Sequence, residues 1–200
     1  MKEFQGKPDH DELYRSAELQ AGYFTSRQAA RAGFQSKLLW HYEKTGQFLR
    51  VAHGIYRLAR FPASPLEDLF VAWLRCGPKS AISHESALAV YDLSDVMPGE
   101  IHVTVPRTAS RRQAGIRQHT RPLRLGDVKI REGLPVTSVP GTVADVAKAG
   151  LAEDLVRGAI REALRHGLTN KRSLMREAKR YGGRAARLIT KHVAESGEHS

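Results

Sequence analysis

The side chains best placed to do chemistry in this chain are basic, and the chemistry they suit is contact with a polyanion. Among 200 residues, 32 lysines and arginines stand against 21 aspartates and glutamates, which gives a formal net charge of +11. A charge excess of this size favours nucleic acid as a partner. Two stretches concentrate the charge: 107–124 holds six arginines and no acid, and 157–187 holds ten basic residues and two acids.

A helix-turn-helix pattern lies ahead of both stretches. Thr25 is followed three residues later by Gln28, which is the capping-box spacing that begins a helix, and Gly33 ends that helix. A second helix is predicted over 35–45, with Leu38, Leu39 and Tyr42 facing inward. Two short helices joined by a turn that contains glycine are typical of a module whose second helix enters the DNA major groove.

A hairpin predicted after these helices completes a winged helix. The segments 47–52 and 55–59 are rich in strand-forming residues, and His53 and Gly54 form the turn between them. The predicted wing presents Arg50 and Arg57 to the phosphate backbone. The predicted DNA contacts are Thr25, Ser26, Arg27, Gln35, Ser36, Lys37, His41, Lys44, Arg50, His53 and Arg57.

A linker rich in proline at 61–65 separates two predicted domains. Residues 1–60 are expected to form the winged helix-turn-helix domain, which also holds a short helix at 9–19, and residues 65–200 a mixed domain. In the second part, Ile101, Val103 and Val105 alternate with polar residues, which predicts a half-buried strand. Further strands are expected at 116–119, 127–131 and 134–137, and helices at 66–75, 83–91, 141–148, 151–166, 171–180 and 184–194. The expected fold class is α+β.

Neither a metal site nor a cofactor is expected from the spacing of the ligand-type residues. The nine histidines form no HxH or HxxxH pattern, and the single cysteine, Cys76, excludes a thiolate cage. Phosphate-binding loops rich in glycine and the serine-nucleophile motif are absent from the sequence. The sequence therefore predicts a binding protein rather than an enzyme.

Two alternatives to a DNA-binding regulator remain open at this stage. A metal-dependent nuclease would need clustered carboxylates, and the candidates are dispersed along the chain. These candidates are Glu85, Asp92, Asp95, Glu100, Asp127 and Asp145. The other alternative is an adaptor that binds RNA or docks a toxin.

A second basic surface, separate from the winged helix, is predicted from the two basic stretches. On a helix, Arg157, Arg161 and Arg165 share one face, where three like charges repel unless something neutralises them. The predicted members are Arg107, Arg111, Arg112, Arg117, Arg157, Arg161 and Arg165.

A cytoplasmic location is expected. The lone cysteine suits a reducing compartment. No apolar run approaches the roughly 18 residues of a membrane span, and the first residues lack the apolar core of a signal peptide.

Several segments resemble the AbiEi family of type IV toxin–antitoxin antitoxins, which are bacterial transcriptional regulators. The resemblance is carried by 23–30, 49–58, 65–73, 83–88, 101–106 and 134–142, and it covers about residues 12–150. It implies a winged helix that binds double-stranded DNA at inverted repeats in its own promoter. It also implies a second domain that counters a nucleotidyltransferase-like toxin without forming a tight complex.

Overall fold

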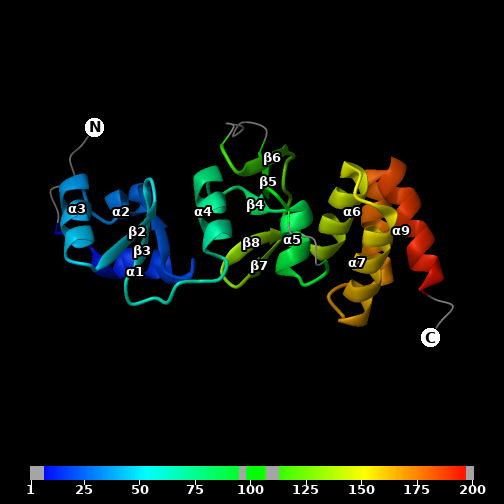
Figure 1. The fold of residues 1–200 in the computed structure, drawn as a ribbon, viewed down its shortest axis with the longest axis horizontal. Coiled ribbons are helices and arrows are strands. Elements are labelled where there is room, and N and C mark those ends of the chain that lie inside the picture. The colour runs from blue at the N-terminus through cyan, green and yellow to red at the C-terminus, as the bar shows by residue number, and fades with distance from the viewer. Residues whose placement is uncertain (1–6, 95–97, 107–112, 197–200) are drawn as a thin grey trace. The chain divides into compact units, whose positions relative to one another are not determined.

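The computed structural model describes residues 7–94, 98–106 and 113–196 (Figure 1). Contacts within the chain divide it into two units, each with its own helices and strands. The N-terminal unit is Met1–Pro78 with Glu132–Leu134, and the C-terminal unit is Lys79–Arg131 with Pro135–Ser200. The predicted α+β class is confirmed. Among the described residues, no helix combines the length and the hydropathy needed to cross a membrane.

The N-terminal unit contains the predicted winged helix. Its elements are α1 (His10–Glu18), β1 (Tyr23–Thr25), α2 (Ser26–Arg31), α3 (Ser36–Lys44), β2 (Phe48–Ala52), β3 (Ile55–Leu58) and α4 (Glu67–Cys76). The three strands form one antiparallel sheet in the order β1-β3-β2. Asp9 caps α1 through the Glu12 amide, and Thr25 and Gln28 form the predicted capping box of α2.

Aromatic rings fill the core between these helices and the sheet. Phe24, Phe34 and Phe48 are almost completely buried, and the Phe48 ring lies 5.1 Å from Phe24 and 5.6 Å from Phe34 between centroids. Tyr42 of α3 stacks on Phe48 at 4.8 Å, which fixes α3 against β2. Aromatic pairs at these distances add to the stabilisation that comes from burial alone.

Tyr23 connects the sheet of this unit to α4. Its hydroxyl donates a hydrogen bond to Glu67 Oε2 at 2.9 Å and accepts one from the Ser64 amide at 3.1 Å. The Tyr23 ring stacks on Phe70 with centroids 4.8 Å apart. The segment predicted as a linker therefore leads into a helix that packs on the N-terminal unit.

The C-terminal unit contains a five-stranded mixed sheet. Its strands are β4 (Ala81–Ile82), β5 (Ile101–Val105), β6 (Ile116–Thr120), β7 (Val128–Arg131) and β8 (Leu134–Thr137), in the order β6-β5-β4-β8-β7. Strand β4 is antiparallel to β5 and parallel to β8, and β5 is parallel to β6.

The helices in the described part of this unit are α5 (His84–Val90), α6 (Val139–Ala149), α7 (Glu153–Arg165), α8 (Lys171–Tyr181) and α9 (Gly183–Glu195). Helix α6 contacts α5, α7, α8 and α9, and Figure 1 shows α6, α7 and α9 side by side. Residues 141–147 of α6 are all buried, which fits a central helix that is apolar around most of its circumference. The predicted helices and strands of this half are present, with ends shifted by a few residues.

The prediction that the strand at 101–105 is half-buried is wrong. His102 and Thr104 are 5% and 0% exposed, and so are as well buried as the apolar residues between them. Helix α5 packs on β5, and the His102 amide donates to Ser86 Oγ of that helix at 2.9 Å. The polar side chains of His102 and Thr104 therefore lie on a second buried face of the strand and do not face solvent.

Candidate nucleic-acid interface

The first part of the candidate interface is the exposed side of α3. Leu39 is buried, and Leu38 and Tyr42 pack against the core, as the sequence predicted. The opposite side is exposed and consists of Gln35, Ser36, Lys37, Trp40, His41 and Lys44. Gln35 is the residue before the first turn, and its side chain makes no capping hydrogen bond. Side chains of this kind can reach base edges or phosphates when a helix enters the major groove.

A glycine turn joins α2 to α3. Gly33 has φ of +84°, a left-handed conformation that glycine adopts without the steric cost of a Cβ atom. The next residue, Phe34, is completely buried and donates its amide to the Ala29 carbonyl at 2.9 Å. The buried ring and this hydrogen bond hold the two helices of the helix-turn-helix together.

The start of α2 supplies two more exposed groups. Ser26 and Arg27 are exposed, whereas Thr25 is half-buried and its hydroxyl accepts a hydrogen bond from the Gln28 amide at 3.2 Å. Thr25, one of the predicted DNA contacts, therefore serves primarily to cap the helix.

The wing lies beside the start of α2. The turn at His53 and Gly54 joins β2 to β3, and Gly54 has φ of +68°. The Gly54 carbonyl accepts a hydrogen bond from the Ser26 amide at 2.9 Å, which fixes the tip of the wing next to the first turn of α2. Arg50 and His53 are exposed, and the Arg50 guanidinium lies 3.2 Å from His53 Nδ1.

Arg57 does not lie on the exposed wing as predicted. Its side chain is only 12% exposed, donates to the Phe61 carbonyl, and pairs with Glu67 at 3.8 Å. Both partners belong to the segment that follows the hairpin, so this segment covers the side chain. Arg57 therefore stabilises the N-terminal unit.

The second basic surface is described only in part. Arg107, Arg111 and Arg112 lie outside the described residues. Arg117 is exposed on β6, and Arg157, Arg161 and Arg165 are exposed on α7. Glu162 pairs with Arg165 at 2.6 Å and with Arg161 at 3.3 Å, which offsets part of the repulsion along this helix face.

Three of the carboxylates considered for a nuclease, Glu85, Asp127 and Asp145, are held by basic partners. Asp145 pairs with Arg121 at 2.9 Å, Asp127 pairs with Arg180 at 2.6 Å, and Glu85 lies 2.6 Å from His102. Asp95 lies outside the described residues. The described carboxylates therefore do not gather into the metal-binding cluster that the nuclease alternative requires.

Three histidines come together that the sequence spacing did not connect. His102 is 18 residues after His84 and 17 before His119, and one ring nitrogen from each of the three lies within 4.8 Å of the other two. Burial lowers the pKa of both His84 and His119 to about 4. The Glu85 carboxylate lies 2.6 Å from His102 Nδ1, and this neighbour lowers the pKa of Glu85 to about 2. The only sequence signal was the polar residues at alternate positions in two strands.

Comparison with known proteins supports the helix-turn-helix assignment. Residues 11–59 match the family model for the transcriptional regulator AbiEi antitoxin, which confirms the resemblance over that segment. No match was found among curated proteins. Among solved structures, the crystal structure of the RV2827C protein from Mycobacterium tuberculosis is similar, with a TM-score of 0.56 and 13% identity. That match covers 94% of this chain and 76% of the other, and at this identity it shows a shared fold alone.

Proposed function

We propose that this chain, whose residues 11–59 match the AbiEi antitoxin regulators, is a DNA-binding transcriptional repressor that acts as an antitoxin. It binds inverted repeats in the promoter of its own operon and counters a nucleotidyltransferase-like toxin without forming a tight complex. It acts in the cytoplasm and is not an enzyme. The observation that carries the proposal is the family match over a winged helix whose polar side of α3 is exposed.

In this proposal the two exposed parts of the winged helix have different roles. Gln35, Ser36 and Lys37 lie at the start of α3, and in helix-turn-helix proteins the first residues of the second helix contact base edges. Arg50 and His53 lie on the wing, where a cation holds the backbone and carries no sequence information. Specificity therefore comes from α3, and part of the affinity comes from the wing.

Fluorescence anisotropy with the protein's own upstream DNA and a scrambled control tests this proposal. A sequence-reading repressor binds its own DNA more tightly at both a low and a high salt concentration, because base contacts survive screening better than general attraction. Equal, steeply salt-dependent binding to both DNAs would overturn the proposal and leave only generic attraction from the net charge of +11.

Three variants separate the two roles. Arg50→Ala weakens binding to both DNAs alike and reduces the salt slope by about 1, as expected when one phosphate contact is lost. If Lys37 contacts a phosphate, Lys37→Ala weakens binding to both DNAs alike and reduces the salt slope by about 1. If Lys37 contacts a base, the variant reduces the preference for the upstream DNA by about 1–3 kcal/mol. Lys148→Ala, an exposed lysine of α6 outside both proposed binding surfaces, is the control and keeps the parent's affinity.

The antitoxin role is tested by growth of cells that express a nucleotidyltransferase-like toxin, chosen from the genes directly downstream of this one if such a gene is present there. Co-expression of the full chain restores growth if the chain is an antitoxin. A pull-down recovers no toxin if neutralisation proceeds without a tight complex. Unchanged toxicity in the presence of the folded chain would leave a DNA-binding regulator and remove the antitoxin half of the proposal.

A further inference from the structure

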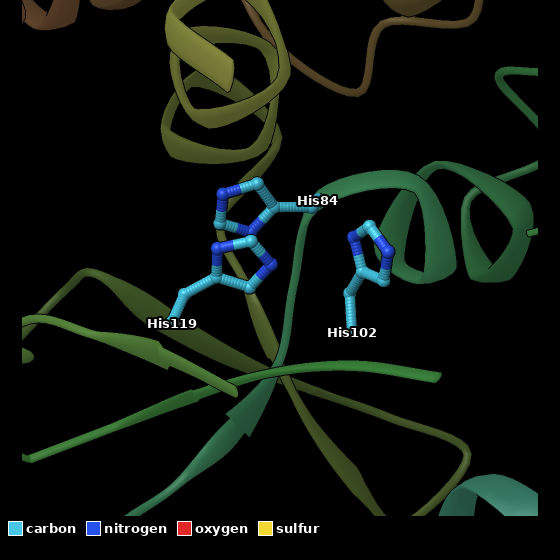
Figure 2. Close-up of side chains that lie close together, drawn as sticks. All are labelled: His84, His102 and His119. Carbon is cyan, nitrogen blue, oxygen red and sulfur yellow. The ribbon is translucent and has the colours of Figure 1, made fainter. Parts of the chain in front are cut away.

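The C-terminal unit gathers three imidazoles from three different elements (Figure 2). His84 begins α5, His102 lies on β5, and His119 lies on β6, the edge strand beside β5. In the parallel pairing of β5 with β6, Thr104 is opposite His119. Because His102 is two residues from Thr104, the side chains of His102 and His119 lie on the same face of the sheet. Strand β4 lies beside β5, so the chain that leaves β4 brings His84 to that face.

These imidazoles are buried and, at neutral pH, two of them are uncharged. His84 and His102 are 6% and 5% exposed, and His119 is half-buried. With the pKa of His84 and of His119 near 4, both rings carry a free nitrogen lone pair at pH 7. Within the described residues, His119 Nε2 is buried and has no hydrogen-bond partner. A buried polar atom without a partner is costly, which indicates that it binds something else.

Neighbouring groups orient two of the rings through their Nδ1 atoms. Glu85 Oε2 lies 2.6 Å from His102 Nδ1, and Ser83 Oγ lies 3.0 Å from His84 Nδ1. Both contacts leave Nε2 directed elsewhere. A carboxylate on the far nitrogen of a histidine is the arrangement that orients metal-ligating histidines and raises their basicity.

His84 also has an unusual backbone conformation. Its φ is +53°, a left-handed conformation that only a few per cent of residues other than glycine adopt, histidine more often than most. Strained residues of this kind are found preferentially at ligand-binding and active sites. This conformation holds the His84 ring against the His119 ring, with centroids 3.5 Å apart.

We propose that His84, His102 and His119 bind one divalent transition-metal ion, Zn²⁺ being the first candidate, through their Nε2 atoms. Imidazole is a preferred ligand of Zn²⁺, and three histidine ligands leave a fourth position open to water. Nitrogens on a tetrahedral zinc ion lie about 3.4 Å apart, and each must direct its lone pair at the ion. Stacked rings cannot both do this, so the rings of His84 and His119 turn apart when the ion binds.

The surrounding charges permit a cation at this position. Arg121 and Arg117 both act electrostatically on His84, and Arg117 also acts on His119. The Arg121 guanidinium is paired with Asp145 at 2.9 Å and with Asp127 at 3.3 Å, and Arg117 is exposed to solvent, which screens its charge. Glu85 contributes a negative charge directly behind His102. An ion at this point links the start of α5 to β5 and β6, and so stabilises the C-terminal unit.

Calorimetric titration of the full chain, free of any affinity tag, with Zn²⁺ tests the proposal. We expect one ion per chain, a higher melting temperature with Zn²⁺ than with a chelator, and a visible absorption band when Co²⁺ is used in place of Zn²⁺. His119→Ala abolishes all three signals. His166→Ala, which removes an exposed histidine at the end of α7, leaves them unchanged. Glu85→Gln keeps the stoichiometry and weakens the affinity about 10–100-fold.

A second measurement does not depend on whether a variant folds. In the histidine NMR spectrum of the parent protein, stoichiometric Zn²⁺ shifts the ring signals of three of the nine histidines and leaves the others in place. The proposal is overturned if the parent shows no binding by calorimetry. It is equally overturned if binding persists in a folded His119→Ala variant, or if Zn²⁺ shifts exposed histidines instead of this set.

Discussion

Asp127 accepts hydrogen bonds from three basic residues of the C-terminal unit, one of which lies 53 positions away along the chain. Its carboxylate accepts hydrogen bonds from Arg180 at 2.6 and 2.8 Å, from Arg121 at 3.3 Å and from the Arg124 amide at 3.0 Å. Burial alone raises the pKa of this carboxyl, but these donors outweigh burial and hold it below its usual 3.8. The charged form is therefore the one that the folded protein stabilises.

Replacing Asp127 is expected to change both the stability and its pH dependence. Because the folded-state pKa is depressed, the stabilisation is present above about pH 3.8 and is lost as the pH falls further. Asp127→Asn lowers the free energy of unfolding at pH 7 by about 1.5–3 kcal/mol, the range for hydrogen bonds to charged groups. Urea unfolding at pH 7 and pH 3 measures this effect, and the difference from the parent shrinks at pH 3.

Asp92→Asn is the matched control, since Asp92 is exposed and its left-handed backbone, with φ of +56°, also suits asparagine. This variant unfolds like the parent at both pH values. A deficit of Asp127→Asn that is as large at pH 3 as at pH 7 would mean that charge pairing is not its source.

At the scale of elements, the Phe61 ring packs directly against the backbone of Gly22, the residue before β1. Gly22 precedes β1, has φ of +89°, and a Cβ atom on it would lie 2.4 Å from the Phe61 ring. Gly22→Ala therefore has two costs: alanine must adopt a left-handed backbone conformation, and the Phe61 ring must move away from the new methyl group. We expect a loss of about 2–5 kcal/mol in the free energy of unfolding, measured by thermal or urea denaturation.

Gly46→Ala separates these two contributions. Gly46 ends the α3 segment with φ of +73° and has no atom within 4 Å of its added Cβ. Only the backbone cost of about 1–2 kcal/mol applies there. Equal losses for Gly22→Ala and Gly46→Ala would show that Phe61 moves away at no cost and that the close approach is unimportant.

Elements with strong local signals were predictable from the sequence, and short ones were not. The capping box at Thr25 and Gln28 placed its helix correctly, because its contacts lie within four residues along the chain. Strands β1 and β4 have three and two residues, which is too short for an alternating pattern, and only their partners in the sheets define them.

The same reasoning explains what was missed at the histidine cluster. The order of strands in the C-terminal sheet places His84 beside residues that are 18 and 35 positions away, and no local spacing encodes that order. The division of α3 into a buried and an exposed side was predictable, because both sides lie on one helix with a regular repeat. Arg57 was misplaced because the segment that covers it follows the hairpin.

At the scale of the whole molecule, the net charge of +11 raises the question of whether the basic face of α7 binds DNA or only adds to a general attraction. Arg157, Arg161 and Arg165 line this face, and Glu162 neutralises only part of their charge. Replacing all three with glutamine lowers the net charge by three and keeps good helix formers in α7. The matched control replaces the exposed Arg172, Arg176 and Lys179 of α8 with glutamine, which is the same change in net charge on another helix.

If α7 contacts DNA, its triple variant loses more affinity than the α8 variant, and its salt slope falls by about 0.9 for each phosphate contact removed. Anisotropy titrations at three salt concentrations measure both quantities, and circular dichroism checks that the helices remain. General attraction depends on net charge, which is the same in the two variants, so it predicts equal losses. Equal losses would therefore assign DNA binding to the winged helix alone, since the α7 arginines would then act only through the field of the whole protein.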